Sequence, residues 1–142
     1  MKTNFDIYTS FVSPWTWKHL VQEGNYLPIL AIRNIKNSNV VGYLSDTAVH
    51  FKELSPSNSL YQEKRDKKIN LEDFHKRYLI ELSNVSIESI YDRFKQLVNV
   101  SGANGIIIFG YGSDSKSCHR STLASVLNLS GLFKKEITEL VL

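Results

Sequence analysis

The chain has 142 residues, enough for one domain of ordinary size that buries a core without disulfides or metal ions. Hydrophobic residues make up 42% of the chain and charged residues 22%, a balance that excludes wholesale disorder and a coiled coil. The formal net charge of +3 helps an anionic ligand approach, but it does not require nucleic acid as the partner.

A single cysteine excludes an intramolecular disulfide and a cysteine-rich zinc site. The four histidines have no partner at metal-binding spacing, so we expect neither a metal nor another cofactor. The amino terminus lacks the apolar core of a signal peptide, and no apolar run approaches the roughly 20 residues that cross a bilayer. We therefore expect a cytoplasmic protein with no membrane partner.

The first third of the chain predicts a strand, a short helix and a second strand. Aromatic and β-branched residues at 5–9 predict the first strand. The helix is expected from Trp15 to Gly24, which suits a C-terminal cap. The continuous apolar run at 27–33 is typical of a strand buried on both faces of a parallel sheet. Residues 34–55 have no sustained period and predict a long irregular segment with one extended piece at 40–43.

Three helices are expected next. The first, at 57–68, is weakly patterned, and its "EKRDKK" run is most simply a solvated connector. Asn70 is placed to cap the second and Ser86 to cap the third. The residues expected on the buried faces are Leu71, Phe74, Tyr78, Leu79 and Leu82 of the second helix and Ile87, Ile90, Tyr91, Phe94, Leu97 and Val98 of the third.

The last third predicts a turn at 102–105, a doubly buried strand at 106–111, a helix starting near 117 and a last strand at 136–140. Strands that alternate with helices, two of them uniformly apolar, favour an α/β fold. We expect residues 1–142 to form a single three-layer domain with a small, mainly parallel, Rossmann-like sheet flanked by helices.

The chemistry of interest lies where the last of these helices begins. In an open parallel sheet, ligands bind at the carboxyl ends of strands, and Cys118, His119 and Arg120 follow such an end. Unpaired amides at a helix start carry positive partial charge, and they and Arg120 should lower the pKa of the Cys118 thiol. The Arg120 guanidinium also suits two oxygens of a phosphate, sulfate or carboxylate.

Simpler interpretations of these three residues stay open. Cys118 can be an inert buried thiol. His119 can face solvent, because consecutive helical positions point about 100° apart. Arg120 can pair with a carboxylate of the chain. A cysteine phosphatase is not supported, because Ala124 stands where the C-x5-R pattern needs arginine.

The chain resembles the bacterial, archaeal and phage family called domain of unknown function 488. The resemblance is carried by "CHR" at 118–120 after an apolar strand, "IYTS" at 7–10, "LPILAIR" at 27–33, and "FKELSPSNSLYQEKR" leading to "FHKRYLIEL" at 74–82. It implies a compact α/β domain with its functional residues gathered at one sheet edge. Those residues would be Tyr8, Thr9, Ser10, Arg33, Lys52, Pro56, Cys118, His119 and Arg120. The chain departs from the family pattern at 34–47 and in "GYGSDSKS" before the "CHR".

Each of the other implied residues has an ordinary alternative. The hydroxyls of Tyr8, Thr9 and Ser10 can serve turns or caps. Arg33 can form a structural ion pair, Lys52 can be a surface lysine, and Pro56 can start a helix. Trp15 and Trp17 can cover a pocket or stack on a base, although core packing is the commoner use of tryptophan.

Two functional hypotheses follow. In the first, the protein is an enzyme in which Cys118 attacks a small anionic substrate that is nucleotide-like or bears sulfur or phosphate. His119 moves a proton there, and Arg120 holds the developing charge. In the second, a non-catalytic module of phage or mobile-element origin binds a nucleotide, nucleic acid or protein, using the basic stretch 63–77.

Overall fold

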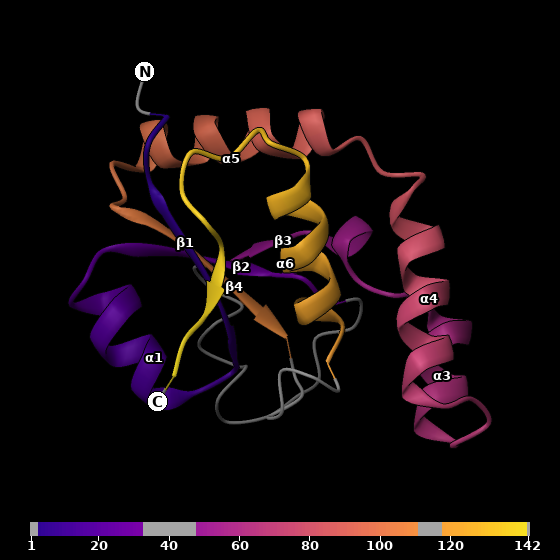
Figure 1. Cartoon of the computed structure of the whole chain (residues 1–142). Coiled ribbons are helices and arrows are strands. Elements are labelled where there is room, and N and C mark those ends of the chain that lie inside the picture. The colour runs from indigo at the N-terminus through magenta and orange to yellow at the C-terminus, as the bar shows by residue number, and fades with distance from the viewer. Residues whose placement is uncertain (1–2, 33–47, 111–117, 142) are drawn as a thin grey trace.

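The computed structural model describes residues 3–32, 48–110 and 118–141. Within these residues five strands form one sheet, in the order β3-β2-β4-β1-β5, and every strand pair is parallel (Figure 1). The strands are β1 (Asp6–Phe11), β2 (Tyr26–Leu30), β3 (Val49–His50), β4 (Gly105–Gly110) and β5 (Thr138–Glu139). The predicted α/β class with a parallel sheet is confirmed.

Helices cover both faces of the sheet (Figure 1). One face packs against α5 and α6, with α3 and α4 beside them, and the other packs against α1 and the π-helical segment η1. The three-layer arrangement is therefore confirmed. The helical bounds are α1 (Pro14–Thr16), η1 (Trp17–Gln22), the 3-10 helix η2 (Lys52–Leu54), α3 (Asn58–Arg65), α4 (Leu71–Leu82), α5 (Ile87–Ser101) and α6 (His119–Leu129).

Strand β4 is the centre of the sheet. It pairs with β1 on one side and β2 on the other, and all six of its residues are buried. The sequence "GIIIFG" allows this, because it has no polar side chain to satisfy between two layers of helices. Helix α6 is the next described helix along the chain, and it begins beside the carboxyl end of this central strand.

The predicted caps Asn70 and Ser86 are confirmed at α4 and α5, and Ser57, which was not predicted, caps α3. The side chains of Ser57, Asn70 and Ser86 each accept a hydrogen bond from a backbone amide in the first turn of α3, α4 and α5. Helix α5 ends at Gly102, whose φ of 72° is a left-handed conformation that glycine adopts without strain.

The structure differs from the sequence predictions in three places. The segment predicted as irregular contains β3 and η2, two elements too short for a periodic signal. Leu71 and Leu79 are about half exposed instead of buried, since α4 packs through its Phe74, Tyr78 and Leu82 face. Strand β2 ends at Leu30, before the end of its apolar run. The extended piece expected at 40–43 lies outside the described residues.

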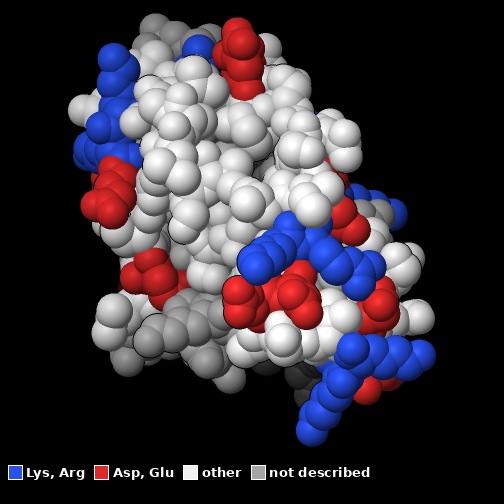
Figure 2. Space-filling view, turned by 45° about the vertical axis from the view of Figure 1, so that its right-hand side comes forward, with Lys and Arg blue, Asp and Glu red and all other residues white. Residues whose placement is uncertain are grey.

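The basic stretch in and around α3 is matched by acidic residues. Arg77 pairs with Glu63 at 2.7 Å, Lys76 with Glu72 at 3.1 Å, and Arg65 with Asp66 at 3.6 Å. Figure 2 shows basic and acidic side chains next to one another on the face that carries α3 and α4. This surface is mixed in sign and does not form a continuous positive track.

No helix among the described residues is both long and apolar enough to span a bilayer.

Two valines of α5 test the packing of this layer. Val98 is 1% exposed in the core and Val100 is 89% exposed on the same helix. We expect Val98→Ala to lower the free energy of unfolding by about 2 kcal/mol, from two lost methyl groups and the space they leave. Val100→Ala should change it by less than about 0.5 kcal/mol. Urea denaturation measures both, and equal effects would contradict this orientation of α5.

Candidate functional site

Cys118 lies at the N-cap of α6, beside the carboxyl end of β4. Its backbone is extended, with φ −94° and ψ 147°, and the helix begins at His119. The thiol is buried at 3% exposure. It fits there because Gly110, the last residue of β4, has no side chain: a Cβ on Gly110 would lie 2.8 Å from the sulfur. The expected position of Cys118 at a strand-to-helix connection is confirmed.

The imidazole of His119 connects the sulfur to the main chain after β2. His119 Nε2 lies 2.5 Å from the carbonyl oxygen of Ala31, and Nδ1 lies 3.7 Å from Cys118 Sγ. A carbonyl oxygen only accepts, so Nε2 carries hydrogen and donates it. The other ring nitrogen, Nδ1, is then the atom that exchanges a proton with the sulfur. This is the geometry of a nucleophile, a base and a group that orients the base.

The side chains of Cys118 and His119 point towards each other because only His119 is helical. Side chains at consecutive helical positions diverge by about 100°. For that reason, the sequence alone was also compatible with a His119 that faces solvent. The extended backbone of Cys118 removes that constraint, and the two side chains meet. His119 is 8% exposed and packs edge-on against the Tyr78 ring, with the ring centroids 5.5 Å apart. The structure therefore places His119 inside the molecule, next to the thiol.

The surroundings lower the pKa of the Cys118 thiol to about 6. Burial raises it, because a thiolate loses solvation, but the hydrogen bond and charge of His119 and the backbone amide and guanidinium of Arg120 outweigh burial. The anion stabilised at the start of α6 is thus the thiolate itself. Such a sulfur is ionised near neutral pH, which is the state in which cysteine acts as a nucleophile.

Arg120 is completely buried and holds a carboxylate of the last strand. Its Nε and Nη2 donate to Glu139 Oε1 and Oε2, each at 2.9 Å, and Thr9 Oγ1 donates to Glu139 Oε1 at 2.7 Å. Burial lowers the pKa of Arg120, but the Glu139 carboxylate and the Cys118 thiolate hold it above its ordinary value. The Nε edge of the guanidinium is therefore used by a structural ion pair.

Sequence reasoning missed Glu139 and Gly110. A glutamate in a short final strand looks like surface, and only the parallel pairing of β5 with β1 brings Glu139 beside Thr9. Gly110 carried a weak signal, because a glycine that ends an apolar strand often marks a close approach of two parts of the chain.

Lys64 of α3 is a third residue that sequence reasoning missed. Lys64 belongs to the "EKRDKK" run that was interpreted as a solvated connector, but its Nζ lies 4.4 Å from the centroid of the buried Phe74 ring. Burial lowers its pKa, the negative charge of Cys118 raises it, and the positive charge of Arg120 lowers it. Lys64 thus shares the electrostatic environment of the thiol.

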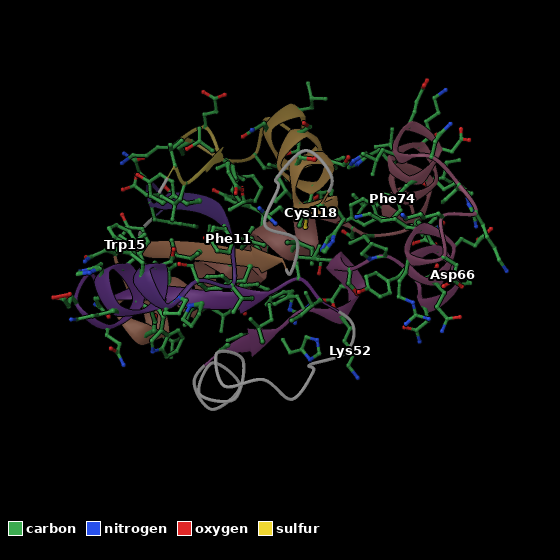
Figure 3. The ribbon with its side chains drawn as sticks, turned by 90° about the horizontal axis from the view of Figure 1, so that it is seen from below. Phe11, Trp15, Lys52, Asp66, Phe74 and Cys118 are labelled. Atoms are coloured by element: carbon green, nitrogen blue, oxygen red, sulfur yellow. The ribbon has the colours of Figure 1, made fainter. Side chains whose placement is uncertain are left out.

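The remaining predicted residues are not brought to the sulfur. Tyr8 stacks on Tyr26, and Ser10 bonds to the Phe11 carbonyl and contacts Thr16 of α1, on the opposite face of the sheet from Thr9. Lys52 is exposed at the start of η2 and points away from Cys118 in Figure 3. Pro56 is buried one residue before the Ser57 cap. Arg33 lies outside the described residues.

The two tryptophans lie away from this site. Trp17 is 7% exposed in the core of the sheet face opposite α6, and Trp15 is 52% exposed against the His19 ring. Trp17 also lines a shallow hollow of about 320 Å³ with Tyr26 and Ala103. That hollow is at the amino ends of the strands, opposite the edge where α6 begins. Within the described ranges, no three histidine, cysteine, aspartate or glutamate residues are grouped to hold a metal ion.

Comparison with known proteins gives a family match. Residues 20–131 match a family model described as the active DUF488-N3 subclade, and this range includes Lys64, Gly110 and the Cys118–Arg120 motif. No curated protein and no solved structure matches the chain.

The ionisation of the thiol gives a direct test. Only a thiolate is alkylated, so the rate of reaction with iodoacetamide should rise with pH and level off, with a midpoint near 6. His119→Ala removes the largest stabilising contact while burial persists, so the midpoint should move up, towards the ordinary 9.0. His19→Ala, at an exposed histidine, is the control and should leave it unchanged. A midpoint above about 8.5 in the wild-type protein would contradict the proposed ionisation.

The ion pair between Arg120 and Glu139 gives a second test. Glu139→Gln leaves the buried guanidinium of Arg120 facing a neutral amide. We therefore expect the free energy of unfolding to fall by about 2 kcal/mol. This loss is smaller than that for a fully buried ion pair, because Glu139 is partly exposed. Glu136→Gln, at an exposed glutamate of the same segment, should have little effect. Chemical denaturation of the two variants compares them, and equal stabilities would show that the pair contributes nothing.

Proposed function

The chain belongs to the DUF488 family, and on that premise we propose that it is a cysteine-dependent enzyme in which Cys118 attacks a small sulfur- or phosphate-bearing substrate. One observation carries the proposal. His119 Nε2 is held by the Ala31 carbonyl, which directs Nδ1 to the Cys118 sulfur. A buried structural thiol needs no oriented base, whereas a nucleophile does.

The reaction follows from these groups. The Cys118 thiolate attacks the electrophilic sulfur or phosphorus atom of the substrate, and the bond from that atom to its leaving group breaks. The leaving group takes the proton from Nδ1 of the His119 imidazolium. An acceptor nucleophile, a thiol where sulfur is bound or water where phosphorus is bound, then attacks the atom bound to Cys118 and passes its proton to His119. The thiolate and the imidazolium are thereby restored.

Attack at sulfur is the better supported of the two chemistries. Phosphoryl transfer by cysteine uses a loop after the nucleophile that surrounds the phosphate, but here α6 begins at the next residue. The Nε edge of Arg120, which could clamp two phosphate oxygens, holds Glu139 instead. A soft thiolate exchanges readily with another sulfur without such a cradle. Such a thiol stays free in a reducing compartment, which supports the expectation of a cytoplasmic protein.

A nucleic-acid-binding module is less well supported. That alternative rests on the basic stretch 63–77, and three of its cations, Arg65, Lys76 and Arg77, pair with carboxylates of the same stretch. A surface that binds the phosphate backbone presents its cations on one continuous track.

Two model reactions test the proposed function. Thiosulfate with cyanide reports sulfur transfer as thiocyanate and sulfite, and p-nitrophenyl phosphate reports phosphoryl transfer as nitrophenolate. We expect turnover of the sulfur donor, no turnover by Cys118→Ser, and a rate lowered roughly a hundredfold by His119→Gln, the loss typical of a missing general acid. Mass spectrometry of the intact wild-type protein with thiosulfate alone should show one added sulfur atom.

His19→Gln is the matched control, since His19 is an exposed histidine paired with Glu23. It should retain the wild-type rate. Turnover that persists in Cys118→Ser would remove the nucleophile role. Turnover of the phosphate ester alone would keep the role of Cys118 but reverse the preference between sulfur and phosphorus.

A further inference from the structure

The His119 imidazole can pass a proton only while its two nitrogens face their partners. Its Nε2 donates to the Ala31 carbonyl oxygen at 2.5 Å, and its Nδ1 lies 3.7 Å from the Cys118 sulfur. The hydrogen bond fixes Nε2, but the ring can still tilt about that atom, because the torsion that turns an imidazole has broad minima. The side chain that packs against the ring therefore decides where Nδ1 points.

Tyr78 of α4 packs against this ring. The two ring planes stand at 83° to each other, and their centroids are 5.5 Å apart. The Tyr78 ring also stacks on the Phe74 ring, with 6.4 Å between the centroids and 11° between the planes. Its hydroxyl donates to the carbonyl oxygen of Leu54 in η2. Tyr78 is fully buried and Phe74 is 1% exposed, so the ring that meets His119 is held both at its face and at its hydroxyl.

A second contact joins α4 to α6 one turn away. His75 Nδ1 lies 2.6 Å from Thr122 Oγ1. Each of these residues is about one helical turn from Tyr78 or His119 and lies on the same helix face. Two contacts one turn apart fix the position of one helix along the other, so Tyr78 meets His119 in a defined register.

The Tyr78 hydroxyl keeps its proton over the range in which the thiol titrates. Burial first, and then the negative charges of Cys118 and Glu81, raise the pKa of Tyr78 well above its ordinary value. Tyr78 is therefore a neutral phenol that donates to the Leu54 carbonyl and exchanges no proton with His119. What it contributes to the site is the position of its ring.

We propose that Tyr78 is a positioning residue, whose ring holds the His119 imidazole between the Ala31 carbonyl and the Cys118 sulfur. This inference rests on the proposed function for its effect on turnover, but its effect on the thiol is measured without a substrate. It also gives a role to two segments outside the thiol motif. "FHKRYLIEL" supplies the ring, and "FKELSP" supplies the carbonyl that anchors it.

Two substitutions of Tyr78 test this role. Tyr78→Leu removes the ring, and Tyr78→Phe keeps the ring but loses the hydrogen bond to Leu54. Iodoacetamide gives the pH midpoint of Cys118 alkylation in each variant, and thiosulfate with cyanide gives the turnover rate. The charged groups around the thiol are the same in every variant, namely His119, Arg120, Glu139 and Lys64.

We expect Tyr78→Leu to move the alkylation midpoint up, towards the ordinary 9.0, but less far than His119→Ala does. The hydrogen bond and charge of His119 lower the pKa of the thiol, so an imidazole that tilts away lowers it less. The turnover rate should fall roughly tenfold, the smaller end of the loss when a group that orients an acting side chain is removed. Tyr78→Phe should stay close to the wild-type protein in both measurements.

The direction of the shift separates positioning from loosened packing. Water that enters the space left by the ring would solvate the thiolate and move the midpoint down. Phe94→Leu is the matched control, because Phe94 is a fully buried residue of α5 whose ring meets Phe51 and Phe133. It should lower the free energy of unfolding and leave the midpoint unchanged.

The outcomes separate this inference from the proposed function. If Tyr78→Leu does not fold, Tyr78→Met replaces it, because an unbranched side chain fills more of the space without a rigid face. A midpoint that stays or falls in the variant without a ring overturns the inference, and so does an equal rise in Phe94→Leu. If the wild-type protein turns over neither model substrate, the proposed enzyme fails, while a rise confined to the Tyr78 variant still supports the positioning role. A wild-type midpoint above about 8.5 contradicts both.

Discussion

The close approach of the Cys118 sulfur to the end of β4 is the constraint on which the site depends. A Cβ on Gly110 would lie only 2.8 Å from the sulfur, so the glycine that ends the central strand leaves room for Cys118 where α6 begins. Cys118 is the N-cap and not the first helical residue, and its extended backbone turns its side chain towards that of His119. If α6 began one residue earlier, Cys118 and His119 would both be helical, and their side chains would point about 100° apart.

The charges around the sulfur explain why a buried thiol can ionise. A thiolate in a protein interior loses its hydration, and that loss alone would raise the pKa of Cys118. The imidazole of His119 and the guanidinium of Arg120 reverse the effect, and Glu139 in turn neutralises the guanidinium. The four groups come from the start of α6 and from β5, and the carbonyl that orients the imidazole follows β2. The site is therefore a product of the strand order.

Much of the architecture was predictable because the signals were local. The apolar runs that became β2 and β4, the period of α5, and the caps at Asn70 and Ser86 all depend on neighbouring residues. The predictions were wrong where packing decided the outcome. Leu79 has the spacing of a core residue, but α4 turns Phe74 and Tyr78 inwards and leaves Leu79 half exposed. The short β3 pairs, among the described residues, only with β2 and has no pattern of its own.

Local sequence signals are enough to predict the fold class, the family and the position of Cys118 at a strand-to-helix connection, since these follow from periodicity and from short motifs. The tertiary structure decided the partners: Ala31 for His119, Glu139 for Arg120, and Phe74 for Lys64. These contacts join residues 88, 19 and 10 positions apart along the chain. No local pattern encodes such pairs, because the order of parallel strands and the packing of α3 on α4 bring them together only when the whole domain has folded.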